Sequence, residues 1–417
     1  MRKGGKLMKN YVIVGNGVAA VGCIEGIRSV DSTGAITVVS EENSPAYCRP
    51  LISYYLEKKT TLEKMPYRPA DFYEKNGCTV LYGQKAEKID ESTQTVLLTN
   101  GSALPYTSVC VATGSSPFVP PFAGLERVKN KFSFMTVEDT LALEKALSPN
   151  ANVFIVGAGL IGLKCAEGIA KRVKSVTVCD LADRVLSSIL DGECAALMQT
   201  RLEENGIAFM LGDTAVAFTE NSATMKSGKK IEFDILVLAV GVRANTSLVK
   251  EAGGEVNRGV VVDTSMKTSL PSVYAAGDCT EGYDLSLGAR RVLAILPNAY
   301  MQGFTAGVNM AGGKKAFDNA IPMNSIGFFG LHAMTAGTYE GTMVEEKTEN
   351  SLKRFFIKDD KLSGFILIGH CERVGILTSL IREKTPLSSV DFDLLTKVST
   401  SLAFNPEIRK KKFGTTV

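Results

Sequence analysis

The sequence predicts an α/β protein in which two similar parallel-sheet domains, the first split by the second, precede a small α+β domain. Three observations predict this fold. Two glycine-rich turns of one type lie far apart in the chain, and the apolar strand ending at Gly241 nearly copies the one ending at Gly114. In the C-terminal region, runs that alternate apolar and polar residues take over. The first two observations predict two Rossmann-like dinucleotide-binding domains.

The two turns have the same chemistry. Each follows an apolar, β-rich run and opens a helix, a context that makes the common GxGxx(G/A) pattern informative. The first glycine allows a tight turn, the second lets the backbone approach a pyrophosphate, and the small last residue lets helix and strand pack closely. The residues predicted to bind are Gly15, Gly17, Ala19 and Ala20 in the first turn, and Gly157, Gly159, Leu160, Ile161 and Gly162 in the second.

An acid is expected at the end of the strand after each turn, about 20 residues on, where it accepts hydrogen bonds from a ribose. After the first turn, Glu41 and Glu42 both stand at this position, and either could bind the ribose. After the second turn, Asp180 stands there. Read alone, each acid is an ordinary exposed loop residue. Because the charge of Asp180 repels a 2′-phosphate, we expect NADH rather than NADPH, a preference that the nearby Arg184 would weaken.

Composition excludes several classes of function. With 45% apolar and 22% charged residues, the 417-residue chain is typical of a soluble globular protein of two or three domains. A net charge of +3 without a basic helix argues against a nucleic-acid partner. No run of about 20 apolar residues exists, so we expect a cytoplasmic protein with no membrane contact. Nine cysteines form no CxxC or CxxxxC pair, which predicts buried reduced thiols and no metal site.

The first domain is predicted to be discontinuous. Residues 272–278 read as a strand that follows the second block without a new glycine turn, so this strand completes the first sheet. Asp278 at its end is placed to accept a hydrogen bond from a cofactor; a surface turn is the alternative. The predicted domains are residues 1–118 with 243–320, residues 119–242, and residues 321–417.

The C-terminal domain is predicted from a hairpin. Two period-two runs, residues 353–357 and 362–369, flank the polar turn Lys358-Asp359-Asp360-Lys361, and a helix follows. A monomer and a homodimer both fit this sequence.

Taken together, these residues resemble the FAD-dependent pyridine nucleotide oxidoreductases over nearly the whole chain. Besides the two glycine turns, the resemblance rests on Tyr47-Cys48-Arg49-Pro50, Ala112-Thr113-Gly114, Gly241-Val242-Arg243 with Asn245, Ala276-Gly277-Asp278, and Pro297-Asn298-Ala299 leading to Gln302-Gly303. It implies that the first unit binds FAD and the second NADH.

The resemblance also implies roles for single residues. Arg49 and Pro50 would lie along the flavin, Asp278 would bind the ribitol, and the helix opening near Pro297 would point its N-terminus at the pyrimidine end of the ring. Further implied contacts are Ala112, Thr113, Gly114 and Gly277 for FAD, and Gly241 for NADH.

The position of the cysteines decides the subfamily. Thiol-dependent members carry a reactive cysteine beside the flavin, but here Pro50 stands at that position and Cys48 lies two residues early. Nor does His332 or His370 stand in the His-Pro context of a catalytic base, so both are expected to be structural or surface residues. An NADH oxidase or disulfide reductase using Cys48 stays an alternative.

A flavin without a thiol relay must pass its electrons directly to an acceptor. The sequence is therefore most similar to NADH:rubredoxin reductases and to the flavin module of nitrite reductases, which implies a small redox protein, rubredoxin or ferredoxin-like, as partner. An electron-input module of a nitrite reductase-type system is an alternative.

One pair of residues departs from those relatives. They commonly carry a lysine and a glutamate flanking the flavin, where this chain has Tyr54 and Lys164. We interpret Lys164 as a relocated positive charge near the flavin N5 or the nicotinamide, and so as a catalytic candidate together with Arg49. A solvated helix residue is the alternative for Lys164.

Overall fold

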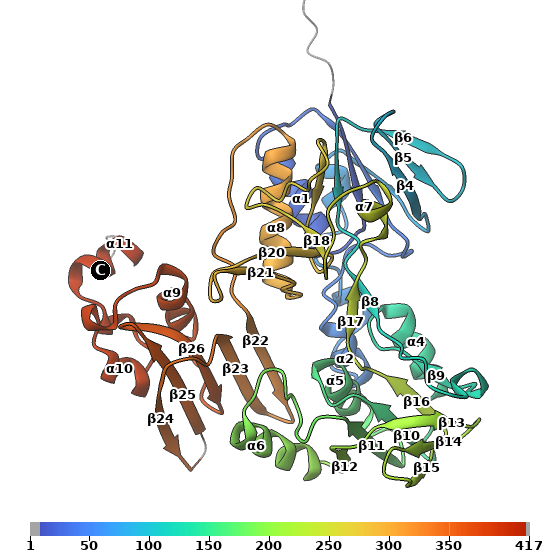
Figure 1. The fold of residues 1–417 in the computed structure, drawn as a ribbon, viewed down its shortest axis with the longest axis vertical. Coiled ribbons are helices and arrows are strands. Elements are labelled where there is room, and N and C mark those ends of the chain that lie inside the picture. Colours follow the sequence, from blue (N-terminus) through green and yellow to red (C-terminus); the bar gives the residue numbers. More distant parts are fainter. Residues whose placement is uncertain (1–8, 350, 414–417) are drawn as a thin grey trace, which may run out of the picture. The chain divides into compact units, whose positions relative to one another are not determined.

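The structure is a computed structural model that describes residues 9–349 and 351–413 (Figure 1). It divides into two compact units, Met1–Pro117 with Val242–Ala320 and Phe118–Gly241 with Ile321–Val417. The predicted α/β fold class, with one part of the chain inserted into another, is confirmed. The assignment of FAD, NADH and interface domains to the predicted boundaries stays a prediction.

The first unit is built on a five-stranded parallel sheet in the order β19-β7-β1-β2-β3. Its strands are β1 (Asn10–Val14), β2 (Ala35–Val39), β3 (Cys78–Leu81), β7 (Ser108–Val111) and β19 (Val273–Ala275). β19 pairs with β7 in parallel, with Val273 opposite Val109. The late strand predicted from residues 272–278 therefore does complete the first sheet.

Two helices of this unit, α1 (Val18–Arg28) and α8 (Leu296–Met310), pack backbone against backbone. A Cβ added to Gly22 would lie 2.3 Å from the carbonyl oxygen of Tyr300, and one added to Gly26 would lie 2.2 Å from that of Phe304. On the other helix, a Cβ at Gly303 would meet α1 at 1.9 Å. Gly26, four residues after Gly22, meets Phe304, four residues after Tyr300. The two helices therefore run parallel, with their N-termini at the same end.

Smaller elements complete the first unit. They are the sheet β4-β5-β6 (Ala86–Asp90, Thr95–Leu98, Ala103–Pro105), the sheet β18-β20-β21 (Val260–Val261, Thr280–Asp284, Ala289–Arg291), and the helices α2 (Leu51–Leu56), α3 (Phe72–Lys75), α7 (Ser247–Glu251) and η1 (Leu62–Lys64). The segment that follows Gly114 begins with β8 (Ser115–Pro117). β8 pairs antiparallel with β17 (Val242–Ala244) in a two-stranded ribbon.

The second unit repeats the parallel sheet in the order β12-β11-β10-β16-β9. Its strands are β9 (Lys131–Phe132), β10 (Asn152–Val156), β11 (Ser175–Asp180), β12 (Ile207–Leu211) and β16 (Ile235–Leu238). The accompanying elements are α4 (Val137–Ala146), α5 (Leu160–Ile169), α6 (Gly192–Glu203), η2 (Leu125–Arg127) and the sheet β13-β14-β15 (Ala215–Phe218, Ser222–Met225, Lys230–Glu232).

The C-terminal part of the second unit is an antiparallel sheet in the order β22-β23-β26-β25-β24. Its elements are β22 (Met323–Phe328), β23 (Leu331–Gly337), β24 (Thr342–Thr348), β25 (Ser351–Lys358), β26 (Lys361–Ile368), α9 (Gly375–Glu383), η3 (Leu387–Ser389), α10 (Phe392–Lys397), η4 (Ser401–Ala403) and α11 (Pro406–Phe413). The hairpin predicted around Asp359 and Asp360 joins β25 to β26, and both residues have the positive φ of such a turn, 50° and 57°.

Within residues 9–349 and 351–413, none of the helices combines the length and the apolar character needed to cross a membrane.

Candidate functional site

The first glycine turn has the geometry of a pyrophosphate cradle. Gly15 has φ +106°, and a Cβ there would lie 2.1 Å from the carbonyl oxygen of Ala112 at the end of the neighbouring strand. Gly17 is the N-cap of α1, makes no side-chain cap, and has nothing within 4 Å of a built Cβ. The helix N-terminus therefore faces open space that a side chain at Gly17 would fill.

The second turn repeats this geometry. Gly157 has φ +117°, with a built Cβ 2.2 Å from the carbonyl oxygen of Ala239, and Gly159 caps α5 with open space before it. At the third glycine, Gly162, a Cβ would lie 2.0 Å from the carbonyl oxygen of Gly157. The tight turn predicted at the first glycine, and open space at the second, are thus present in both units. Ala19 and Ala20 are buried in the hydrophobic core of the first unit, whereas Leu160 and Ile161 are half-buried.

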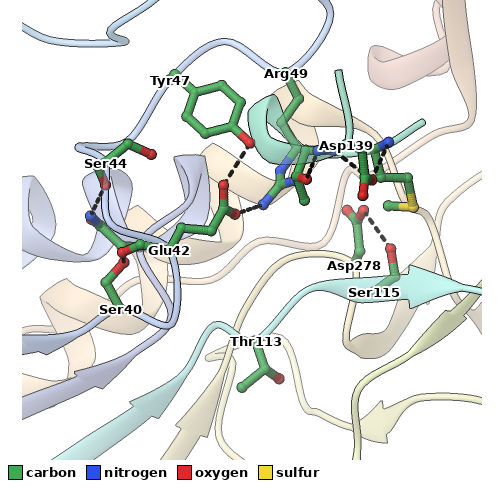
Figure 2. A network of polar contacts seen from close by, with 12 residues as sticks. Ser40, Glu42, Ser44, Tyr47, Arg49, Thr113, Ser115, Asp139 and Asp278 are labelled. Atoms are coloured by element: carbon green, nitrogen blue, oxygen red, sulfur yellow. Dashed lines mark hydrogen bonds and ion pairs between the residues drawn. The ribbon is translucent and has the colours of Figure 1, made fainter. Parts of the chain in front are cut away.

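The two acids after the first turn have different surroundings. Figure 2 shows Glu42 between two side chains: the hydroxyl of Tyr47 donates to its Oε2 at 2.7 Å, and Nη2 of Arg49 donates to its Oε1 at 2.5 Å. Glu41 instead pairs with Lys85 at 3.0 Å and is 70% exposed. Of the two acids left open by the sequence, Glu42 is the one held in a polar network.

A second polar group of this unit surrounds Asp278. Its carboxylate accepts a hydrogen bond from the hydroxyl of Ser115 at 3.3 Å (Figure 2), and burial raises its pKa, while Ser115 and the charge of Arg49 oppose the rise. The preceding Gly277 has φ +86°, and its N–H donates to Oε1 of Gln302 at 2.8 Å. Since Gln302 belongs to α8, this helix fixes the turn that carries Asp278.

Thr113 and Gly114 are held by a residue distant in sequence. Nδ2 of Asn245 donates to the carbonyl oxygen of Thr113 at 2.9 Å, and the Thr113 hydroxyl donates back to the carbonyl of Asn245 at 2.8 Å. Gly114 has φ +64°. Pro297 is exposed in the first turn of α8, whose N-cap makes no side-chain hydrogen bond. Pro50 is likewise exposed, as the N-cap of α2.

Asp180 lies at the end of β11 and holds the second glycine turn directly. Its Oδ2 accepts from the N–H of Ala158 at 2.7 Å, and its Oδ1 accepts from the N–H of Ala182 at 2.8 Å. Arg184 pairs with Asp183 at 2.9 Å. Gly241, with φ +107°, is exposed and lies between β16 and β17.

Lys164 is not a solvated helix residue. Its Nζ lies 2.5 Å from Oε2 of Glu167, donates to the carbonyl oxygen of Gly327 at 2.8 Å, and sits 5.2 Å from the ring centre of Phe328. The other oxygen of Glu167 accepts from the N–H of Phe329 at 2.7 Å. The pair therefore ties α5 to the β22–β23 hairpin, and a role for Lys164 at the flavin stays a prediction.

Glu167 is a residue that sequence reasoning missed. It is 6% exposed, and buried acids are rare unless paired. The available signal is its spacing of three residues from Lys164, which places both on one helix face.

The cysteines lie as expected for reduced thiols. All nine are free, and Cys48 is only half-buried. Burial raises the pKa of Cys48, and the hydrogen bond with the Leu51 amide only partly opposes this rise, so the thiol stays protonated near neutral pH. His332 and His370 are both exposed, in agreement with a surface role.

These residues fit two dinucleotides. Both turns offer backbone N–H groups and an uncapped helix end across open space, as a pyrophosphate requires. In the first unit, a carboxylate with a raised pKa lies beside the end of β19, where a hydroxylated chain would find an acceptor.

Comparison with known proteins agrees with this geometry. The model of the family "Pyridine nucleotide-disulphide oxidoreductase" matches residues 9–303. The chain is 31% identical to the NADH-dependent phenylglyoxylate dehydrogenase subunit epsilon of Aromatoleum evansii, over 91% of this chain and 92% of that one. It is 31% identical to a rubredoxin-NAD(+) reductase of Pseudomonas putida, over 70% and 77%.

A longer relative is matched over part of its length. The chain is 29% identical to the assimilatory nitrate reductase electron transfer subunit of Bacillus subtilis over 90% of its own residues, but it spans only 50% of that protein.

Among solved structures, the putidaredoxin reductase in its covalent complex with putidaredoxin is similar with a TM-score of 0.86 and 25% identity, over 94% of this chain and 97% of that one. The match therefore includes the C-terminal sheet as well as both glycine turns. With both turns, the acids that follow them and the family match in agreement, the chain belongs to the pyridine nucleotide-disulphide oxidoreductase family and is an FAD-dependent NAD(P)H oxidoreductase.

Proposed function

We propose that this chain oxidises NADH with a bound FAD and passes the electrons to a small redox protein, rubredoxin or ferredoxin-like. The observation that carries the proposal is the repetition of one turn geometry, with Gly17 and Gly159 each opening a helix onto free space. When bound, FAD takes up a hydride and releases electrons one at a time, so the protein needs only to bind, orient and shield.

In the first unit, Gly15 and Gly17 would hold the FAD pyrophosphate. We assign the ribose to Glu42 rather than Glu41, because Glu42 is held in a network and Glu41 is engaged on the surface by Lys85. Asp278 would accept from the ribitol. Thr113, Gly114 and Pro297 would bound the ring, as the family resemblance implies.

In the second unit, Asp180 favours NADH over NADPH. Each of its oxygens accepts one backbone N–H and keeps a second lone pair for a ribose hydroxyl. Its charge would repel a 2′-phosphate. Arg184, which would attract that phosphate, is engaged by Asp183 and by the carbonyl oxygen of Leu190 at 3.3 Å.

A direct transfer to a protein acceptor is favoured over thiol chemistry. A disulfide reductase needs a thiolate beside the flavin, but burial raises the pKa of Cys48. The relative from Pseudomonas putida is named for rubredoxin, and the similar solved structure contains a reductase joined to its redox partner. Both names support a small redox protein as acceptor.

A second candidate function is that of an electron-input subunit. The relative from Aromatoleum evansii, matched over 92% of its length, is named as one subunit of a dehydrogenase. In that case the acceptor is a fixed partner chain rather than a diffusing protein.

Steady-state NADH oxidation with several acceptors tests the proposal. Rubredoxin, ferredoxin, a low-molecular-weight disulfide and oxygen are compared in parallel, with wild type and Cys48→Ser. We expect the redox proteins to give the highest kcat/KM with both proteins. Fast disulfide turnover that Cys48→Ser abolishes would contradict the proposal, and slow turnover with every free acceptor would favour the subunit.

A further inference from the structure

A loop of the second unit joins β11 to α6 and lies against the second glycine turn. This loop, residues 181–191, begins after Asp180, whose carboxylate accepts from the N–H of Ala158. The carbonyl oxygen of Ala158 in turn accepts from the N–H of Leu186 in the loop at 2.9 Å. The middle residue of the turn is therefore held from both sides, by the strand end and by the loop.

The loop is held in a conformation that it would not keep alone. Leu186 has φ +51°, which is unfavourable for a residue with a branched side chain, and it is only 1% exposed. Val185 beside it is fully buried. The buried side chains of the loop and its contacts with other elements together keep it in place.

The C-terminal sheet supplies those contacts at the far end of the loop. The hydroxyl of Tyr339, which follows β23, donates to the carbonyl oxygen of Ile189 at 2.6 Å. Nη1 of Arg354, on β25, lies 2.6 Å from Oδ2 of Asp191. Both contacts join the C-terminal sheet to the last residues of the loop.

Arg354 is a buried cation with several acidic partners. It is 8% exposed, and its guanidinium also contacts Glu345 on β24 at 2.7 Å and Glu193 on α6. The other oxygen of Asp191 accepts from the N–H of Cys194 at 3.0 Å and so caps α6. One buried cation thus fixes the point at which the loop ends and α6 begins.

We propose that Tyr339 and Arg354 are positioning residues for the pyridine nucleotide. They hold the 181–191 loop, which holds Ala158 and so the backbone that meets the nucleotide pyrophosphate. If these contacts are lost, the end of the loop near Asp191 becomes disordered, and nucleotide binding must order it again. The affinity for the nucleotide then falls, while flavin binding is unchanged. This inference rests on the proposed nucleotide site in the second unit.

Two mild variants test the inference. Tyr339→Phe removes the hydroxyl and keeps the ring that lies 5.0 Å from that of Phe356. Asp191→Asn keeps a good helix cap and removes the ion pair with Arg354. The control is Lys358→Met, which breaks an exposed pair between Lys358, the last residue of β25, and Glu340 in the connection between β23 and β24.

NAD⁺ binding to the oxidised holoenzyme is measured by calorimetry, beside steady-state kinetics with NADH, flavin content and flavin midpoint potential. We expect each test variant to bind NAD⁺ about 3- to 10-fold more weakly, the loss of one hydrogen bond, with a raised KM and an unchanged kcat. Flavin content and potential should match those of wild type, and the control should behave like wild type throughout.

Three results would overturn the inference: wild-type NAD⁺ affinity in both test variants, equal weakening in the control, or flavin loss in step with affinity. Failure of the proposed function is distinguishable, because wild type itself would then neither bind NAD⁺ nor be reduced by NADH.

Discussion

Ser40 and Asp180 occupy the same place in the two units. The N–H of Gly15 donates to the carbonyl oxygen of Val39 at 2.8 Å, and Ser40 comes next in the chain. The N–H of Gly157 donates to the carbonyl oxygen of Cys179 at 2.7 Å, and Asp180 comes next. Only the second unit has a carboxylate there. In the first, the hydroxyl of Ser40 donates to the backbone oxygen of Glu42 at 2.7 Å, and the acid comes two residues later. Under the proposed assignment of Glu42 and Asp180 to the two riboses, the repeated fold would place its ribose acid at two different positions.

Replacing Gly17 with Leu should weaken FAD binding while the protein stays folded. A Cβ at Gly17 would meet no protein atom within 4 Å, so a larger side chain there would extend into the space before α1 that the pyrophosphate would use. We expect at least about a tenfold loss of affinity, measured as FAD per chain after dialysis. Gly375→Leu is the control, because Gly375 also has nothing within 4 Å and begins a helix of the C-terminal sheet region. Equal flavin loss in both variants would contradict the assignment.

Replacing Asp180 with Asn should reduce the preference for NADH. The Asn side chain keeps one oxygen that can accept a backbone N–H of the turn, but it lacks the charge that would repel a 2′-phosphate. We therefore expect the ratio of the rates of flavin reduction by NADH and by NADPH to fall about tenfold. Anaerobic stopped-flow reduction with both nucleotides measures it. Asp183→Asn is the matched control, since its side chain is 80% exposed and pairs with Arg184. If Asp183→Asn shifts the preference and Asp180→Asn does not, selectivity depends on Arg184.

Replacing Lys164 with Met should lower the melting temperature. It leaves Glu167, whose side chain is 4% exposed, without its cation, and breaking a buried pair typically costs about 3–5 kcal/mol. The double variant Lys164→Met/Glu167→Gln should recover most of the loss, and the exposed Lys171→Met should show none. An unchanged melting temperature in Lys164→Met would show that the pair carries no stability. NADH reduction of the double variant tests the catalytic role separately: a rate at least about tenfold below wild type would support it.

Glu25 should stabilise the first unit only above acidic pH. Burial alone would raise its pKa, but hydrogen bonds from Arg68 at 2.7 Å and Tyr300 at 2.5 Å, with the Arg68 charge, lower it. A lowered folded-state pKa gives stability that is present above the unfolded value, about 4.3, and is lost as the pH falls through the folded value.

Glu25→Gln should therefore lower the melting temperature by about 3–6 °C at pH 7 and have a shrinking effect below about pH 4. Thermal unfolding across this range is compared with Glu220→Gln, which removes an exposed pair with Lys129. A difference that stays constant with pH would rule out the ionised carboxylate as its cause.

The sequence predicted what depends on local backbone chemistry. Gly15 and Gly157 were identifiable because only glycine tolerates their φ and the neighbouring carbonyl. A close contact on one face of α1 could have been suspected from Gly22 and Gly26, spaced four residues apart, since that spacing leaves the face bare; the partner α8 and its parallel direction could not.

Other features depend on contacts between distant segments and have no local signature. The pairing of Glu167 with Lys164 could be suspected from spacing, but its contact with Phe329 could not. Tyr339, just after β23, and Arg354, on β25, are far in sequence from the loop that they contact, so nothing in their own sequence neighbourhood marks them.

The most direct test of the account is anaerobic titration of the purified protein with NADH, for wild type and Cys48→Ser, followed by addition of oxidised rubredoxin. The account predicts that one NADH per chain bleaches the bound FAD in both proteins and that rubredoxin restores its colour while becoming reduced. An FAD that stays oxidised with NADH, or a Cys48→Ser variant that is reduced but cannot pass its electrons on, would contradict it.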